Sequence, residues 1–443
     1  MPNLPRQIRL AAGDYFMHGQ DRRMRRLGLP GNVCRVSLSL DPGLNVPLLR
    51  ERIQQSPILD WMAHARVVRT FPLLPPRWRI VEDSSPVLHE HHLPSGAGAG
   101  VGGLPPVVAQ RDLHPGQGPA IAVDLVHYPD ESRQLVLTWS HTLMDARGAE
   151  FVLRHLNPVG AKPGPTAENL VNPTQLKRSL AERWRRLKMA RSSLKWLRES
   201  GREPLFTLMP ALQPGGRCSS HLRLMPFTQE ETAAIDARSQ SFNAGFQRSH
   251  FYLAAALRGL HAVAALRGNR DGAYLVPVPH DMRRRGGNGP IFSNQLSILF
   301  YRIEPRLAGS LSQIVAELNR QMMDQIRAQF PDSCMAALDL FKPLPLDYYV
   351  RHLGQPSGGK FASLCFSDSG ETCQGMADFV GGPIQRVTHL VPTWRPPGLT
   401  VLFWRYGQQL SSLLSWVDDC LSPSEADLLE RGLRAGLLEE AIS

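Results

Sequence analysis

His141 and Asp145 are the two residues whose types and spacing best fit a chemical role, that of proton transfer. A histidine with an unperturbed pKa near ~6.5 is a neutral base at cellular pH, and a general base is most effective when its pKa lies close to the working pH. We therefore expect His141 to be the base. Asp145 either accepts a hydrogen bond from the imidazole or ties the loop to a cation elsewhere, so that the ring stays in one rotamer. A His-x3-Asp pair also arises by chance, so the surrounding sequence decides whether this pair has a chemical role.

The elements that must position this pair can be predicted from apolar periodicity. The alternating run Gln134–Trp139 predicts a strand that ends just before His141, and apolar residues at helical spacing from Ala149 to Leu156 predict a helix after it. Ala120–His127 predicts a second strand, which pairs with the first across a polar turn. A hairpin therefore delivers His141 to the point where a strand gives way to a turn and a helix.

Length and composition indicate a two-domain globular protein. The chain has 443 residues, of which 42% are hydrophobic and 20% charged, enough for two domains of about 200 residues with a sizeable core. The N-terminus has no apolar run like that of a secretory signal, and no segment reaches the ~18 apolar residues of a membrane span, so we expect a cytoplasmic protein. The six cysteines are scattered without paired spacing, which predicts reduced thiols rather than a disulfide framework or a zinc site.

The formal net charge of +11 is partly local. Residues 174–200 carry nine cations against Glu182 and Glu199, together with leucines and tryptophans at helical spacing. This pattern predicts a basic amphipathic helix. Such a helix lies on an anionic membrane surface, docks an acidic partner such as an acyl carrier protein, or packs its apolar stripe on the protein as a linker. Nucleic-acid binding is not expected, because no recognised binding motif is present.

Changes in composition divide the chain into three parts. Residues 1–160 form an N-terminal subdomain that carries His141, residues 161–217 a crossover that contains the basic helix, and residues 218–443 a C-terminal subdomain.

Local patterns predict several elements of the two subdomains. We expect strands at Val33–Leu40, Leu399–Tyr406 and Gln409–Val417 and a buried helix at Phe251–Leu266. The histidine-rich segment His89–His92 has no Cys/His pair at ligand spacing, so a solvated loop is expected there rather than a metal site.

The motif Ser140–Gly148, SHTLMDARG, resembles the H-x-x-x-D motif of the chloramphenicol-acetyltransferase-like superfamily. This superfamily includes condensation domains of non-ribosomal peptide synthetases, plant acyl-CoA-dependent acyltransferases, and wax ester synthase/diacylglycerol acyltransferases. The condensation and wax ester branches usually carry a second histidine where Ser140 stands and a glycine where Ala146 stands; the plant branch needs only the single histidine. The resemblance implies an α/β fold of mixed sheets, with two chloramphenicol-acetyltransferase-like subdomains and a tunnel between them.

A second, weaker resemblance lies farther along the chain. The family pattern of V-P-V, then an arginine, then a glycine-asparagine pair opening a strand is matched by YLVPVP, Arg283 and Ser293-Asn294, with serine replacing the usual glycine. The resemblance implies that Arg283 holds Asp145, that Gly148 supports the motif, and that Asn294 lies near the tunnel. The pair makes physical sense because a desolvated aspartate is costly to bury alone, and an arginine can bind it in two places.

The resemblance also implies an acyltransferase. His141 would remove a proton from a hydroxyl or amine of a hydrophobic small-molecule acceptor, which attacks an acyl-CoA or the phosphopantetheine thioester of an acyl carrier protein. Candidates for the oxyanion donor or the tunnel wall are Ser140, Asn294 and Ser367, besides a backbone amide. No metal and no bound cofactor is expected. Two alternatives stay open: a free-standing condensation-type enzyme that forms an amide or ester in natural-product biosynthesis, and a non-catalytic relative that binds a ligand in the tunnel.

Overall fold

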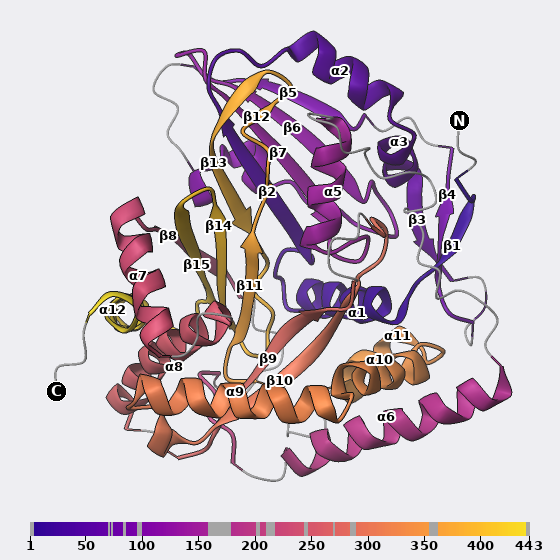
Figure 1. Cartoon of the computed structure of the whole chain (residues 1–443). Coiled ribbons are helices and arrows are strands. Elements are labelled where there is room, and N and C mark those ends of the chain that lie inside the picture. The colour runs from indigo at the N-terminus through magenta and orange to yellow at the C-terminus, as the bar shows by residue number, and fades with distance from the viewer. Residues whose placement is uncertain are drawn as a thin grey trace.

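The computed structural model describes residues 4–69, 71, 74–82, 86–94, 100–157, 179–200, 204–209, 218–242, 247–268, 271–283, 289–353 and 362–439. These residues form two halves, each built on a mixed sheet with helices packed against it (Figure 1). Up to residue 157 the elements are β1 (Gln7–Arg9), α1 (Ala12–Arg26), β2 (Val33–Leu40), α2 (Val46–Gln55), α3 (Pro57–His64), β3 (Ala65–Val68), β4 (Arg77–Ile80), β5 (Leu88–His92), η1 (Val101–Gly103), α4 (Pro106–Ala109), β6 (Ile121–His127), β7 (Arg133–Ser140) and α5 (Ala146–Leu156).

The elements of the second half follow the basic helix. They are α6 (Leu180–Ser200), β8 (Ser220–Pro226), α7 (Gln229–Ser241), α8 (Arg248–Leu266), β9 (Tyr274–Asp281), β10 (Leu296–Ile303), η4 (Pro305–Leu307), α9 (Leu311–Arg327), α10 (Phe330–Phe341), α11 (Leu346–Leu353), β11 (Cys365–Glu371), β12 (Asp378–Phe379), β13 (Gly382–Leu390), β14 (Leu399–Tyr406), β15 (Gln409–Val417) and α12 (Pro423–Leu438).

The first sheet has six strands in the order β12-β13-β2-β7-β6-β5. Its neighbours pair antiparallel except for β5 and β6, which are parallel. Val36 of β2 lies between Leu137 of β7 and His389 of β13, which is more than 350 residues away in sequence. The sheet that carries His141 is therefore not confined to residues 1–160, because it takes β12 and β13 from the far end of the chain.

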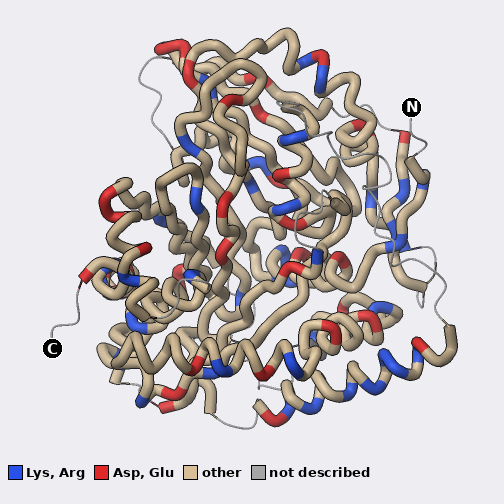
Figure 2. The backbone as a smooth tube through the Cα atoms, viewed as in Figure 1, with Lys and Arg blue, Asp and Glu red and all other residues tan. Residues whose placement is uncertain are grey.

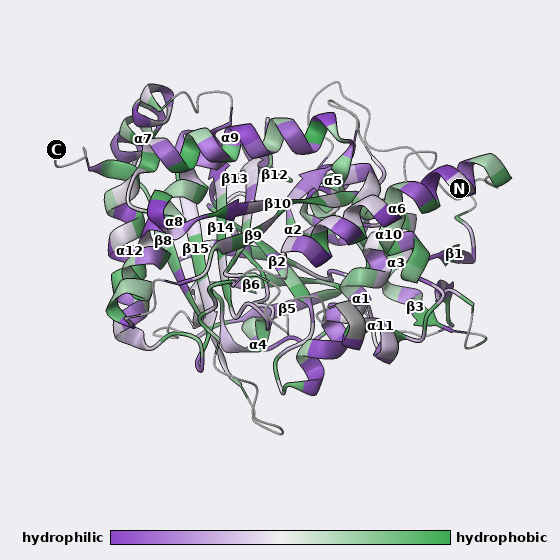
Figure 3. Ribbon diagram, turned by 90° about the horizontal axis from the view of Figure 1, so that it is seen from below, coloured by the Kyte–Doolittle hydropathy of each residue, from purple (hydrophilic) through white to green (hydrophobic). Residues whose placement is uncertain are grey.

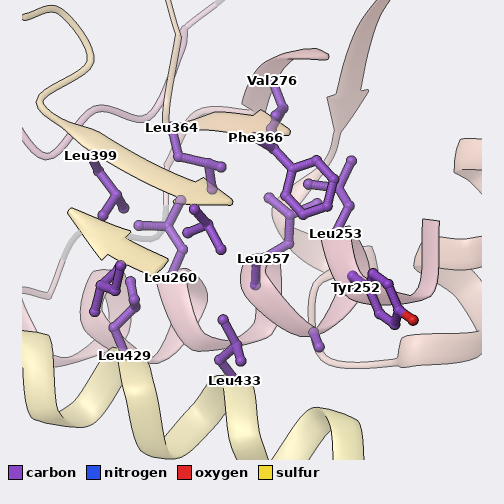
Figure 4. Close-up of a cluster of buried hydrophobic side chains, with 14 of the residues drawn as sticks. Tyr252, Leu253, Leu257, Leu260, Val276, Leu364, Phe366, Leu399, Leu429 and Leu433 are labelled. Carbon is purple, nitrogen blue, oxygen red and sulfur yellow. The ribbon is translucent and has the colours of Figure 1, made fainter. Parts of the chain in front are cut away.

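The second half packs a four-stranded sheet, β11-β14-β15-β8, on α8. A cluster of buried side chains joins this sheet to α8 and α12 (Figure 4), among them Leu257 and Leu260 of α8, Phe366 of β11 and Leu433 of α12. Gly259 lets the two helices approach closely, because a Cβ atom there would lie 2.6 Å from the carbonyl oxygen of Leu429. The buried helix predicted from the apolar run Phe251–Leu266 is confirmed.

Several strand predictions agree with the structure and one segment differs from its prediction. β2, β14 and β15 have the predicted bounds, and β14 and β15 each include six consecutive buried residues. The loop expected at His89–His92 is wrong, because these residues belong to β5, an edge strand parallel to β6. Their polar side chains depart from the apolar alternation that is typical of a strand, yet they interact with residues of β6. His91 Nε2, for example, lies 2.8 Å from a carboxylate oxygen of Asp124.

The described part of the basic segment is the helix α6, and residues 174–178 lie outside the described ranges. α6 packs on α10, where Ala190 is buried and the Ser193 hydroxyl donates to the carbonyl oxygen of Ser333 (3.0 Å). Figure 2 shows cations recurring along this helix, and Figure 3 shows hydrophilic and hydrophobic residues alternating along it. Among the described residues, no helix is both long and apolar enough to cross a bilayer.

Candidate active site

Backbone hydrogen bonds fix the loop that carries His141. The strand β7 ends at Ser140, and the amide of His141 then donates to the carbonyl oxygen of Asn32, just before β2 begins (2.8 Å). Leu143 N donates back to Ser140 O (2.8 Å), and the indole Nε1 of Trp139 donates to Met144 O (3.0 Å). The loop is therefore a closed turn, and His141 holds one place at the end of the strand.

Asp145 ties this loop to the second half of the chain. Its two carboxylate oxygens accept four hydrogen bonds: two from the Arg283 guanidinium (2.9 and 3.0 Å), one from the amide of Gly148 (2.9 Å) and one from the amide of Gln295 (2.9 Å). Both charged side chains are almost fully buried. The ion pair implied by the resemblance is thus present. Of the two roles considered for Asp145, the structure shows the one in which it binds a cation, and not the one in which it binds the imidazole.

Gly148 lies where α5 meets the segment before β10. Asp145 is the N-cap of α5, and the amide of Gly148 is the group that it caps. A Cβ atom at Gly148 would lie 2.5 Å from the carbonyl oxygen of Ile291, which is closer than van der Waals contact permits. Glycine is therefore required at position 148 because two backbone segments approach closely there. This agrees with the prediction that Gly148 supports the motif.

Asn294 joins the histidine loop to α1. Its side-chain Nδ2 donates to the carbonyl oxygen of His141 (2.8 Å) and to a carboxylate oxygen of Asp14 (3.0 Å), which also accepts from the amide of Asn294 (2.7 Å). Both N–H groups of the side-chain amide are therefore engaged. Although Asn294 lines the cavity described below, it has no side-chain donor left for an oxyanion and instead holds the carbonyl of His141.

Burial favours the neutral form of the His141 imidazole. Burial lowers its pKa from the ordinary value, and the negative charge of Asp145 opposes this shift. The ring atom Nδ1 is buried and makes no hydrogen bond to any described residue. Since Nδ1 is buried, a hydroxyl or amine in the cavity could pass its proton only to the other ring nitrogen, Nε2, of the neutral imidazole.

A largely apolar cavity lies between the halves, and His141 is part of its wall. The first half contributes side chains such as Phe16 and Trp139, and the second half contributes side chains such as Pro279 and Leu402. Two further cavities adjoin it. Arg35, Val391 and Pro392 line both the central cavity and one beside β2 and β8, whereas Pro279 and Phe366 line both the central cavity and one beside β9 and α9. Each of these two cavities therefore shares wall residues with the central cavity, which contains His141.

The two serine candidates lie in different surroundings. Ser367, on β11, lines the central cavity, and its hydroxyl has no hydrogen-bond partner within the described ranges. Ser140 is fully buried, its Oγ accepts from the amide of Thr142 (3.3 Å), and it does not line the cavity. Of the candidates for the oxyanion donor or the tunnel wall, Ser140 is therefore the one turned away from the cavity, because the end of β7 directs this side chain into its own loop.

Sequence reasoning missed a second histidine in the cavity wall, His389 of β13. Its Nε2 lies 2.8 Å from the hydroxyl of Thr372, which donates to Glu150 of α5 (3.0 Å). Because the hydroxyl hydrogen is used on Glu150, the hydroxyl oxygen must accept from His389 Nε2–H, which leaves Nδ1 as the acceptor nitrogen. Burial lowers the pKa of His389 to about 4, so this ring is also neutral. The one signal available was a histidine near the end of a strand, between Thr388 and Leu390.

The histidine-rich edge of the first sheet is a separate cluster. Glu90, His92 and His127 offer atoms within 4.8 Å of one another, a spacing that a metal ion could span. However, Arg50 donates to both carboxylate oxygens of Glu90 (2.6 and 2.7 Å), and the rings of His92 and His127 are stacked. The carboxylate is thus already paired with a cation.

Comparison with known proteins finds likeness at the level of the fold. No protein-family model matches the chain, and no curated protein matches it in sequence. Among solved structures, TRI3 trichothecene 15-O-acetyltransferase from Fusarium sporotrichioides is 12% identical with a TM-score of 0.69, covering 98% of this chain and 95% of that chain.

Condensation domains are similar to the same extent. The first condensation domain of the calcium-dependent antibiotic synthetase, solved with a substrate analogue, is 15% identical with a TM-score of 0.69, covering 98% of this chain and 96% of that chain. A mutant starter condensation domain of rhizomide synthetase RzmA, in complex with C8-CoA and Leu-SNAC, is 16% identical with a TM-score of 0.65, covering 98% and 94%. The α/β fold with two chloramphenicol-acetyltransferase-like subdomains, predicted from the resemblance, is confirmed.

Proposed function

We propose that the protein is an acyltransferase in which His141 is the general base. The observation that carries this proposal is the place of His141: a neutral imidazole in the wall of the central cavity, on a loop fixed by the buried Asp145–Arg283 pair. In this proposal both substrates reach the base through the cavities between the halves. The fold, which is that of an acetyltransferase and of condensation domains, supports the same reaction class.

The reaction proceeds by two proton transfers at one imidazole. His141 takes the proton of a hydroxyl or amine, and the oxygen or nitrogen attacks the carbonyl carbon of a thioester. The resulting tetrahedral oxyanion collapses, the carbon–sulfur bond breaks, and the imidazolium returns the proton to the departing thiolate. The Ser367 hydroxyl is the oxyanion donor favoured here, because it lines the cavity and is not engaged elsewhere among the described residues; such a donor contributes roughly 3 to 4 kcal/mol.

The donor is a thioester of coenzyme A or of a carrier protein. The RzmA neighbour was solved with C8-CoA and with an aminoacyl thioester, and the apolar cavity wall of this chain fits an acyl group of similar character. A hydrophobic alcohol or amine is the acceptor. The second candidate function is that of a condensation-type enzyme, which forms an amide or ester from a carrier-bound acyl group. The likeness to two condensation domains favours it. A non-catalytic relative would keep the cavity without turnover.

The outer face of α6 is a docking surface for an acidic partner in this proposal. Arg183, Lys188 and Arg191 are exposed on it, and Leu180 and Trp184 are exposed at its start. The inner face packs on α10, so these side chains do not contribute to the core. An acyl carrier protein and an anionic membrane surface both match this charge.

Turnover by the His141→Ala variant tests the proposal. Octanoyl-CoA and octanoyl carrier protein are each offered with a panel of alcohols and amines, and products are measured by mass spectrometry together with release of the free thiol. We expect the variant to lose about 10²- to 10⁴-fold in rate, because the proton acceptor is gone. His221→Ala, at an exposed position on β8, is the matched control and should retain full activity. Undiminished turnover by His141→Ala would contradict the proposal.

The choice of donor separates the two candidate functions. Transfer from octanoyl-CoA supports the acyl-CoA-dependent enzyme, whereas transfer only from the carrier protein supports the condensation-type enzyme. A wild-type protein that binds the donor and releases no thiol supports the non-catalytic relative.

A further inference from the structure

Arg35 lies at the junction of two of the cavities. It is on β2, where it pairs with Thr138 of β7 and Leu390 of β13. It lines both the central cavity that contains His141 and the adjoining cavity beside β8. A substrate that extends from His141 toward the adjoining cavity therefore passes this guanidinium.

No carboxylate among the described residues pairs with Arg35. Its one side-chain hydrogen bond there runs from NH2 to the backbone carbonyl oxygen of Arg111 (2.5 Å), and its Nε is buried without a partner. A half-buried cation without an anion is costly, since a guanidinium carries five N–H donors and a full charge. The side chain therefore has unused capacity for an acceptor that brings negative charge.

The charges of the neighbouring Asp124 and Asp112 act on Arg35 from a distance, but neither carboxylate binds it directly. Asp124 accepts a two-pronged set of hydrogen bonds from Arg111 (2.5 to 3.2 Å), and Asp112 accepts two from Arg25 (2.5 and 2.8 Å). Each of these acids is held by its own arginine. Arg35 is thus the cation of this group that remains without a direct acidic partner.

We propose that Arg35 binds an anionic oxygen group of a substrate at the junction of the two cavities. A guanidinium binds a carboxylate or a phosphate through two parallel hydrogen bonds, which fixes orientation as well as charge. The inference rests on the proposed acyl transfer, since it names the charge of a substrate for the same cavity. The anion is either a carboxylate on the acyl acceptor or the phosphate of a phosphopantetheine arm.

The register of β2 favours the carboxylate. Arg35 is three residues from Asn32, whose carbonyl accepts the His141 amide, so the backbones of Arg35 and His141 are about 10 Å apart along the strand at ~3.3 Å per residue. This separation suits a compact acceptor that carries its reacting group and its anion on one small skeleton. A phosphate at the end of a long pantetheine arm is the second source.

Direct binding of two matched probe pairs tests the inference. Octanoate is compared with octanamide, and 4′-phosphopantetheine with pantetheine, by isothermal titration calorimetry at pH 7. We expect the wild-type protein to bind the charged member of a pair about 10-fold more tightly, as a charge-assisted pair of hydrogen bonds implies. Arg35→Gln should lose this preference and Arg35→Lys should keep part of it.

Arg52→Gln is the matched control. Arg52 is likewise half-buried and donates to a backbone carbonyl, that of Leu156 (3.0 Å), but it does not line the cavities described above. It should keep the full preference. A preference for octanoate identifies the anion as a carboxylate, and one for phosphopantetheine alone assigns it to the phosphate of the donor arm. A wild-type protein with no charge preference in either pair, or an Arg35→Gln variant that retains it, overturns the inference.

The two proposals fail separately in this design. His141→Ala should keep the charge preference, because that binding requires no proton transfer. Charge preference without acyl transfer would overturn the proposed function alone, and acyl transfer without charge preference would overturn the role of Arg35 alone.

Discussion

At the scale of single residues, the Asp145–Arg283 pair decides whether His141 stays in place. All four acceptor positions of the Asp145 carboxylate are used, two of them by Arg283. Arg283→Ala would leave a buried charge with only backbone donors. We expect this variant to lose about 3 to 5 kcal/mol of unfolding free energy, measured by denaturant titration, together with acyl transfer.

Two variants make that comparison interpretable. Arg283→Lys keeps the charge but not the two-pronged geometry, so it should lose less stability than alanine. Arg320→Ala breaks an exposed pair with Glu317 on α9 and should cost less than about 1 kcal/mol. Equal losses for Arg283→Ala and Arg320→Ala would show that the buried pair does not support the loop.

The state of the imidazole predicts a pH profile. Burial lowers the pKa of His141, so the neutral base persists below the usual range and is lost only on further acidification. We expect kcat/KM to be constant near neutral pH and to fall on the acid side, with an inflection below ~6.5. Asp145→Asn removes the charge that raises this pKa, so its inflection should move to lower pH. An inflection at or above pH 7 would contradict a buried neutral base.

At the scale of elements, Thr372 links three of them: the end of β11, the strand β13 through His389, and the helix α5 through Glu150. Thr372→Val has the same shape without the hydroxyl, so it leaves the His389 N–H and a Glu150 oxygen unpaired in a buried place. We expect it to lower the free energy of unfolding by about 1 to 3 kcal/mol. Thr372→Ser keeps the hydroxyl and should lose less. A valine variant as stable as the wild type would contradict the link.

Elements with a clear period could be predicted, and those stabilised by distant partners could not. The strand Val33–Leu40 alternates cleanly, and its bounds were predicted without error. The segment His89–His92 reads as a polar loop, and it becomes a strand because β6 offers backbone partners and Asp124 binds His91. Ser293, which stands where the resemblance places a glycine, has a φ of 81°, in the left-handed region that glycine adopts most readily.

At the scale of the whole molecule, the site is assembled from parts that no local pattern connects. The motif residues His141 and Asp145 and the cation Arg283 could be predicted because the resemblance covers them. His389 and Arg35 could not, since their relation to His141 depends on β13 joining the first sheet and on cavities between the halves. The pairing of strands that are hundreds of residues apart depends on the folded chain. It produces no periodic pattern in the sequence from which it could be predicted.

Asp14 is where the two halves share a buried charge, and it predicts how stability depends on pH. Asp14, on α1, accepts hydrogen bonds from Asn294, yet burial raises its pKa from 3.8 to about 6. Between these values the folded protein binds a proton that the unfolded chain has released. The stability of the fold therefore falls as pH rises through about 4 to 6, by up to about 3 kcal/mol at 1.36 kcal/mol per pKa unit.

Asp14→Asn removes this titration while keeping an oxygen that can accept from Asn294. We expect the free energy of unfolding of the wild type, relative to this variant, to decrease between pH 4 and pH 7 by up to about 3 kcal/mol, since the variant does not have to bury a charge. Urea titrations of both proteins at several pH values measure the difference. A difference that is constant over this range, or that increases with pH, would mean that hydrogen bonds from Asn294 and Ala11 outweigh the burial of the carboxylate and hold its pKa near that of the unfolded chain or below it.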